Sequence, residues 1–392
     1  MQLKHALLSA ALVATSAFAQ TALKGYDKSN MDLSARPGQD FYEYAGGGWM
    51  KAHPLTPEYT RFGQFDQLHE NNQAQVRELI EDLAKHPQAK GTLGQKIGSL
   101  YNLAMDSVRR NREGIAPLRP VLAKVRDIKS KKDYQLVVAQ LDRKGAAAMM
   151  FDFGISADIR NAAMNLVNIS QGGISLGERD YYLNDDSTTV KVRNAYKAYI
   201  KKLFTMVGDD QSTAEKKMQA VLAIETQIAK ASYSATQLRD VEGNYHKMSY
   251  AQLLKDFPGI DWEATRTALG FPTFQDVTVN QIEPLHEVEK ILNDYTLDDL
   301  KAYAEFKVID AAANALDDNF RAASFDFYSK TMSGAQQDRP RWKRAVGVVN
   351  GVLGMAVGKM YVEKYFPEAA KKRMSCRRLT YRRTFHRVVF QG

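Results

Sequence analysis

Residues 76–85 read VRELIEDLAK, and their pattern decides the kind of fold that this chain can form. Four apolar side chains lie in the stretch: Val76, Leu79, Ile80 and Leu83. They stand at positions i, i+3, i+4 and i+7, which is the spacing of one apolar stripe along an α-helix. The stretch therefore predicts an amphipathic helix that runs to about residue 85.

The same periodicity recurs along most of the chain. It predicts further helices over residues 93–108, 134–143, 191–207, 214–229, 297–316 and 344–365. Residues 149–155 and 164–169 instead alternate apolar and polar side chains on either side of a turn-like segment, which indicates a β-hairpin. Residues 275–279 predict another short strand, and the Gly-rich residues 171–182 predict a loop.

The helix expected over residues 344–365 combines an apolar stripe with a row of glycines. The stripe consists of Val346, Val349, Leu353, Val357 and Met360, and the glycines are Gly347, Gly351, Gly354 and Gly358. Each glycine weakens the helix by roughly 1 kcal/mol relative to alanine. Such a helix needs neighbours that pack closely against it, so we expect it in the interior of the protein.

The first 19 residues have the layout of a secretory signal peptide. Lys4 and His5 precede an apolar run, and the small residues Ala17 and Ala19 form a cleavage site before Gln20. The run is shorter than the roughly 20 residues of a membrane-spanning helix. No later segment is expected to span a bilayer, so the sequence predicts a soluble exported protein without a membrane anchor after signal cleavage.

The cysteine content indicates the cellular location of the protein, and the distribution of charge indicates whether it binds nucleic acid. An exported chain with one Cys has no internal disulfide available, which favours the bacterial periplasm or the extracellular medium. The net charge of +9 is concentrated near the C-terminus, where residues 375–392 contain five Arg and no acid. The rest of the chain is nearly balanced, so we expect no nucleic acid as a partner.

Histidine spacing excludes a zinc site of the commonest peptidase kind. The motif H-E-x-x-H places two His ligands on one helix face with a Glu between them. His69-Glu70 and His286-Glu287 begin this motif, but neither has a His at the fifth position. Hydrolase, phosphate-loop and dinucleotide signatures are also missing. From its motifs, the chain holds no catalytic residues and binds no metal.

Four motifs together resemble one family. They are RPGQDFYEYAGGGW at residues 36–49, LGERDYYL at 176–183, RPRWKR at 339–344 and GKMYVEKYFP at 358–367. Their order and spacing over residues 30–373 resemble the N-terminal part of the neprilysin and endothelin-converting-enzyme family of zinc metallopeptidases. Gln39 departs mildly from the pattern, because the family more often has an acid or Asn there.

The resemblance implies two mainly helical lobes around a central cavity. One lobe holds zinc, which activates water for the hydrolysis of oligopeptides, and the other caps the cavity. This chain resembles the cap, so we expect a mainly α, multi-helical lobe with a small β-hairpin. The implied domains are a signal peptide (1–19), a segment joining the catalytic lobe (20–75), the cap (76–335), the start of the catalytic lobe (336–373) and a basic tail (374–392).

Two residues are candidates for binding substrate. Arg61 matches a family position whose guanidinium can bind the free C-terminal carboxylate of a peptide through two parallel hydrogen bonds. His69 stands where some relatives have a second such Arg, and its weaker charge favours endopeptidase specificity. The alternative is that Arg61 is a solvated residue ahead of a helix. The aromatic residues of the motifs are expected to anchor packing instead: Phe41, Tyr42, Trp49, Tyr181, Tyr182 and Trp342.

The basic tail gives rise to a hypothesis about the gene. Beyond Met374 the family continues an acid-containing helix, whereas this chain turns abruptly basic, so we interpret the tail as a frameshift or gene-model error. The alternative is a natural tail on a short protein. An intact reading frame with a genuine stop after Gly392, and no H-E-x-x-H downstream in any frame, would refute the frameshift.

Two functions remain open from the sequence. The first is the N-terminal region of an exported zinc metalloendopeptidase, with zinc bound in the complete enzyme and this chain inactive alone. The second is a catalytically inactive peptide-binding or regulatory module that retains the cap lobe.

Overall fold

The computed structural model describes residues 27–146 and 148–375. The expected signal peptide (1–19) and nearly all of the basic tail therefore lie outside the described residues. The chain forms two compact units, of which the first ends at Gly63 and the second begins at Gln64.

The first unit consists of a 3₁₀-helix, η1 (Lys28–Asn30), and a helix, α1 (Phe41–Ala52). The Asp40 side chain caps α1 by accepting a hydrogen bond from the Glu43 N–H at 2.9 Å. Asp32 follows η1 and forms an ion pair with Lys51 near the end of α1. Its hydrogen bonds with Lys51 and with Ser34 hold the pKa of the Asp32 carboxyl well below its usual range.

Two glycines allow these helices to approach. A Cβ atom at Gly48 would lie 2.4 Å from the carbonyl oxygen of Ser29, and one at Gly47 would meet Asp32 at 2.8 Å. A Cβ at Gly46, in contrast, would meet no other described atom within 4 Å. The contact between η1 and α1 therefore explains two of the three consecutive glycines in the first motif.

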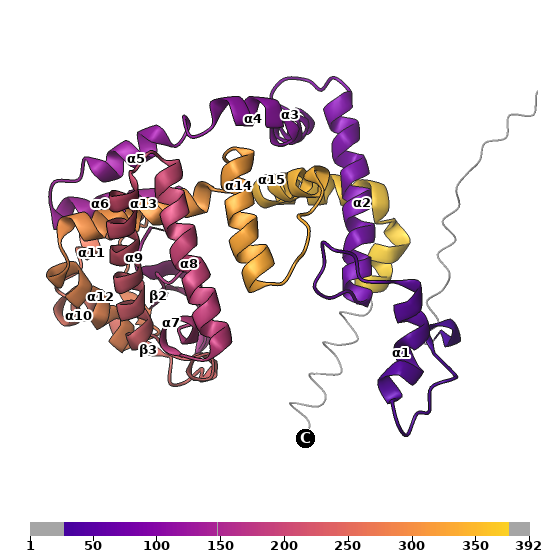
Figure 1. The fold of residues 1–392 in the computed structure, drawn as a ribbon, viewed down its shortest axis with the longest axis horizontal. Helices are drawn as coiled ribbons and strands as arrows, with labels where there is room; N and C mark the ends of the chain where they lie inside the picture. The colour runs from indigo at the N-terminus through magenta and orange to yellow at the C-terminus, as the bar shows by residue number, and fades with distance from the viewer. Residues whose placement is uncertain (1–26, 147, 376–392) are drawn as a thin grey trace, which may run out of the picture. The chain divides into compact units, whose positions relative to one another are not determined.

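The second unit is mainly helical, as expected (Figure 1). Its α-helices are α2 (Gln64–Lys85), α3 (Leu93–Met105), α4 (Ser107–Glu113), α5 (Arg119–Arg126), α6 (Lys131–Asp142), α7 (Asp180–Leu183), α8 (Ser187–Met206), α9 (Gln211–Ala231), α10 (Tyr250–Asp256), α11 (Trp262–Leu269), α12 (Ile282–Asp294), α13 (Leu297–Ala312), α14 (Asp318–Ser324) and α15 (Arg341–Tyr365). A 3₁₀-helix, η2 (Gln237–Arg239), and a π-helix, η3 (Phe325–Met332), complete the helical elements.

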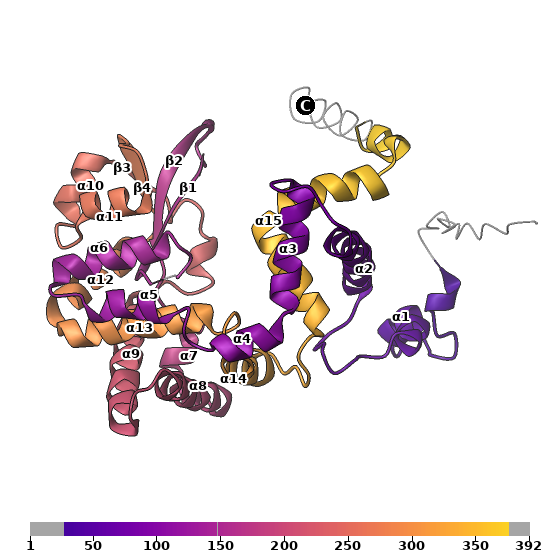
Figure 2. The same ribbon diagram turned by 90° about the horizontal axis from the view of Figure 1, so that it is seen from above.

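A small mixed sheet accompanies the helices. Its strands are β1 (Phe151–Asp158), β2 (Asn161–Gln171), β3 (His246–Ser249) and β4 (Asp276–Val279), in the order β1-β2-β4-β3. Strands β1 and β2 form the predicted antiparallel hairpin, and β2 pairs in parallel with the predicted strand β4. The hairpin extends past the shorter strands (Figure 2). The sequence analysis missed β3, whose four residues are too few for alternation to be recognised.

One helix of the prediction is two helices in the structure. The stretch 93–108 divides at Asp106, which ends α3 and whose side chain caps α4 by accepting from the Arg109 N–H at 2.9 Å. An aspartate at an N-cap position competes with continued helix because its carboxylate binds backbone N–H groups directly. Apolar periodicity alone does not reveal this break.

The second unit contains two hydrophobic cores. The larger one joins the sheet to helices α5 to α14, and its largest fully buried side chains include Trp262, Tyr134, Tyr196 and Tyr303. The smaller one joins α2, α3 and α15, which Figure 2 shows side by side, and contains Val76, Ile80, Ile97, Tyr101, Ala345, Val346, Val349 and Val357. The stripe that predicted α2 therefore packs in the smaller core.

We expect Gly48→Ala to destabilise the first unit by about 1–3 kcal/mol, because the new methyl group would overlap the backbone of η1. Gly46→Ala is the matched control, since its methyl group has space and alanine favours the helix by about 0.5–1 kcal/mol. Hydrogen exchange of the α1 amides measures both effects. Equal protection in the two variants would contradict the contact between η1 and α1.

Candidate functional site

The two predicted substrate-binding residues are both accessible. Arg61 is exposed in the segment that follows α1 in the first unit, and His69 is exposed on α2 in the second unit. Exposure is compatible with binding a peptide and with ordinary solvation. Their proposed roles therefore stay predictions.

The two incomplete zinc motifs have other contacts. The Glu70 carboxylate forms an ion pair with the buried Lys343 at 2.8 Å, which joins α2 to α15. His286 lies 3.0 Å from the Glu289 carboxylate, and its ring packs against Phe257. Among the described residues, no group of three or more His, Cys, Asp or Glu could hold a metal ion. The described residues around these two motifs thus offer no set of zinc ligands.

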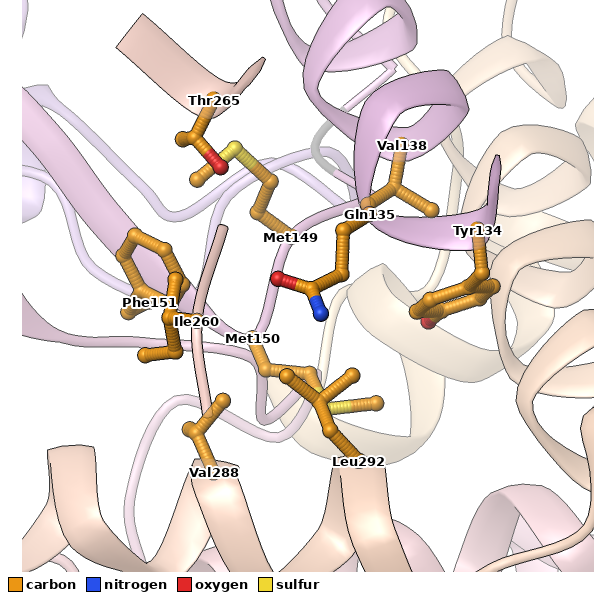
Figure 3. A pocket seen from close by; sticks show the side chains of 10 residues that line it. All are labelled: Tyr134, Gln135, Val138, Met149, Met150, Phe151, Ile260, Thr265, Val288 and Leu292. Carbon is orange, nitrogen blue, oxygen red and sulfur yellow. The ribbon is translucent and has the colours of Figure 1, made fainter. Parts of the chain in front are cut away.

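Figure 3 shows a small cavity in the larger core. Its volume is about 20 Å³, and apolar side chains such as Met149, Phe151 and Leu292 dominate its lining. The Gln135 amide reaches into it, but its oxygen accepts from the Asp261 N–H at 2.7 Å and its nitrogen donates to the Gly259 carbonyl. The cavity has space for about one water molecule, so it is a packing gap and not a substrate site.

The second motif, LGERDYYL, ends in a buried polar cluster. The Tyr182 hydroxyl accepts hydrogen bonds from the backbone N–H groups of Ser175 and Leu176, each at 3.1 Å. It donates to the Glu225 carboxylate at 2.8 Å. Glu225 is 0% exposed on α9 and also accepts from the Tyr196 hydroxyl at 2.7 Å and the Ser175 hydroxyl at 2.6 Å. The motif therefore fixes a loop onto the core.

The Glu225 side chain was missed by the sequence analysis, although a signal was present. It occupies a position within the apolar stripe of α9, between Ile224 and Ile228. Burial raises the pKa of the Glu225 carboxyl, while the Lys307 ammonium 3.9 Å away and the three hydroxyl donors favour its charged form. A carboxylate in an apolar stripe indicates a buried polar network. Here that network joins α9 to Ser175, Tyr182 and Tyr196.

The packing role predicted for the motif aromatics is confirmed at some positions and wrong at others. Tyr182 is buried, and Trp342 is half-buried with the Arg77 guanidinium 4.5 Å from the centre of its ring. Phe41 and Tyr42, however, are 67% and 76% exposed. The reason is that η1 contacts α1 near Gly47 and Gly48, while the first turn of α1 remains in solvent.

The expectation that α15 is an interior helix is wrong for one of its sides. Val346, Val349 and Val357 are buried against α2 and α3, as predicted. On the other side Met355 is 93% exposed, and Val348 and Val352 are also exposed. A Cβ at each of the four glycines would meet no other described atom within 4 Å. Helices α2 and α3 thus cover one side of α15.

The same helix corrects the expectation about membrane segments. The 25 residues of α15 are long and apolar enough to cross a bilayer by length and composition. A core helix of a soluble lobe can pass the same criterion. Because one side of α15 packs into the smaller core, we interpret it as a packing helix.

The same fold occurs in a solved zinc metalloprotease. The chain is similar to zinc metalloprotease Zmp1 of Mycobacterium tuberculosis, solved with an inhibitor, with a TM-score of 0.84 and 31% sequence identity. The similarity covers 90% of this chain and 53% of that one. PepO of Lactobacillus rhamnosis shares the fold with a TM-score of 0.72 at 19% identity, over 87% of this chain and 54% of that one.

The sequence shows the family to which the chain belongs. A sequence model of Peptidase family M13 matches residues 37–376, so the chain belongs to peptidase family M13. Endothelin-converting enzyme 1 of Rattus norvegicus is 29% identical over 358 residues, which cover 88% of this chain and 46% of the relative. The chain thus spans about half the length of the curated relatives it matches. The resemblance and the fold class inferred from the sequence are confirmed.

We expect Tyr182→Phe to lower the free energy of unfolding by at least about 2 kcal/mol. The substitution removes the acceptor of two backbone N–H groups, and a buried N–H group left without a partner costs about 1–3 kcal/mol. It also removes one of the three hydroxyl donors to the Glu225 carboxylate, which keeps Tyr196 and Ser175. Tyr181→Phe, at the adjacent and less buried position, is the control. Urea unfolding measures both, and equal stabilities would exclude the proposed importance of the Tyr182 hydroxyl.

Proposed function

We propose that this chain is the N-terminal region of an exported, zinc-dependent metalloendopeptidase that hydrolyses oligopeptides. The observation that carries the proposal is the family match over residues 37–376. The 31% identity to a zinc metalloprotease of the same fold supports it. Export rests on the signal peptide expected at residues 1–19, and the periplasm or the extracellular medium follows as the location.

In this proposal the zinc is held by residues outside this chain. The described side chains offer no suitable ligand group, and neither His69 nor His286 has a second His at the required spacing. The helical region over residues 76–335 caps a central cavity and limits the substrates to peptides. Residues 336–373 begin the catalytic lobe.

The exposed side of α15 supports this division. Val348, Val352 and Met355 form an apolar surface next to glycines that leave space for a close neighbour. Contiguous exposed apolar surface commonly marks an interface. The curated relatives are about twice as long as this chain, and we propose that their additional half corresponds to the lobe that covers this surface.

The 392-residue chain, purified alone after exposure to zinc, is expected to retain no stoichiometric metal and to cleave no peptide. Elemental analysis and a fluorogenic peptide assay measure this, with a longer family protein as the positive control. Stoichiometric zinc in the short chain would contradict the assignment of the metal site to residues elsewhere. Micromolar peptide binding by the short chain without cleavage would favour the inactive binding module.

In the complete enzyme, Arg61→Ala is expected to raise KM for short peptides with a free C-terminus by roughly 10- to 100-fold. The estimate follows from the loss of a hydrogen-bonded charge pair worth about 1.5–3 kcal/mol. Peptides amidated at the C-terminus should be unaffected, because they lack the carboxylate. Arg36→Ala, at another exposed arginine of the first unit, is the control. An equal effect on both kinds of peptide would refute the role of Arg61.

A further inference from the structure

Five arginines line a large cavity of the second unit, and one of them, Arg109, is paired with Glu113 within α4. The cavity has a volume of about 740 Å³ and lies among α3, α4, α13, α14 and α15. Arg110 comes from α4, Arg321 from α14, and Arg341 and Arg344 from the first turn of α15. Its size is that of a site for a small organic ligand.

The rest of the lining is largely apolar. It includes Leu100, Leu103, Pro117, Leu316 and Val348. An apolar wall with a few convergent polar groups is the usual composition of a ligand site. Here the polar groups are guanidinium groups, so the complementary ligand is an anion with an apolar body.

The arginines outnumber the carboxylates that neutralise them. Asp318 accepts a hydrogen bond from Arg110 at 2.6 Å, and Asp338 pairs with both Arg321 and Arg344. Arg341 donates to the hydroxyl group of Ser107. Four guanidinium groups therefore share two aspartates.

The other charged residues of the lining, Asp106, Arg109 and Glu113, interact with one another or with the backbone at α4. Arg109 pairs with Glu113 at 2.7 Å, and the Asp106 carboxylate accepts from the Arg109 backbone N–H at the start of the helix. The charges of Arg109 and Glu113 cancel, whereas the Asp106 carboxylate keeps its negative charge. The four other guanidinium groups therefore face the three carboxylates of Asp106, Asp318 and Asp338, which leaves a small net positive charge at the cavity.

Two of the guanidinium groups have a buried Nε atom that a ligand in the cavity cannot reach. The Nε atoms of Arg110 and Arg321 are buried and donate no hydrogen bond within the described part of the chain, although Arg321 Nε lies 3.7 Å from Asp318. Burial and repulsion by Arg321, Arg110 and Arg341 lower the pKa of Arg344 to about 10. The close approach of the four guanidinium groups in one lining forms a cluster of positive charge that a bound anion would stabilise.

We propose that this cavity binds a small organic oxyanion, with its carboxylate or phosphate group held by Arg321, Arg341 and Arg344 and its apolar body against the opposite wall. Guanidinium groups bind such oxyanions through parallel hydrogen bonds, and a cluster of several arginines adds charge complementarity. Val348 lies both in this lining and on the side of α15 that we propose an additional lobe covers, so the bound ligand would lie next to that lobe.

Calorimetric titration of the 392-residue chain tests the proposal with matched probes. N-acetylleucine and phenyl phosphate each combine an oxyanion with an apolar group, whereas N-acetylleucine amide lacks the charge and inorganic phosphate lacks the apolar body. We expect at least one of the first two to bind at least about 10-fold more tightly than its matched control. Saturable binding of N-acetylleucine would identify a carboxylate ligand, and binding of phenyl phosphate alone a phosphate ester. Absence of saturable binding by both would overturn the proposal.

Two substitutions locate the binding without breaking an Arg–Asp pair. Arg341→Gln removes the guanidinium group that contacts a hydroxyl, and Ala315→Phe places a ring into the cavity. Each should weaken the binding by about 10-fold or more. Arg112→Gln, at an exposed arginine of α4 outside the lining, should leave it unchanged. Circular dichroism confirms that each variant is folded. Wild-type affinity in both cavity variants would overturn the assignment to this cavity.

Discussion

The carboxylate of Glu225 is the group on which the interior of the large helical region depends. It is fully buried, and it accepts hydrogen bonds from Ser175, Tyr182 and Tyr196. A buried carboxylate is costly unless it has such partners. Its partners come from the LGERDYYL loop and from α8, and Lys307 of α13 lies beside it. The requirement to satisfy one charge thus brings three separate segments onto α9.

The second constraint concerns α15, because one of its sides is buried against α2 and α3 and the other side is exposed. Its valine stripe packs against α2 and α3. The buried Lys343 pairs with Glu70 and fixes the start of α15 to α2. The opposite side carries four glycines and the exposed side chain of Met355. The chain belongs to peptidase family M13 and spans about half the length of its curated relatives, which is the basis of our proposal that a further lobe covers this side.

Local patterns predicted most of the longest helices and the hairpin, but they did not predict α1, α12 or several shorter helices, and they predicted the surroundings of each element less well. The helix that contains Val76 and Ile80, the hairpin and the strand near Val277 were all recognisable, because a period of 3.6 or 2 is written directly into the order of residues. The division at Asp106 was missed, because a capping side chain interrupts a helix without changing the apolar period. The exposure of Phe41 was also missed, since burial depends on which neighbour covers a helix face.

The features of the candidate sites also divide into those that the sequence determines and those that only the tertiary structure decides. The sequence by itself determined the family, the helical fold class and the incomplete zinc motifs, because motifs and ligand spacings are local properties of the chain. The tertiary structure alone decided that Glu225 joins the LGERDYYL loop to α8, and that arginines from α4, α14 and α15 share one cavity. These contacts join residues far apart in sequence. Their energies depend on burial and distance, which no local pattern contains.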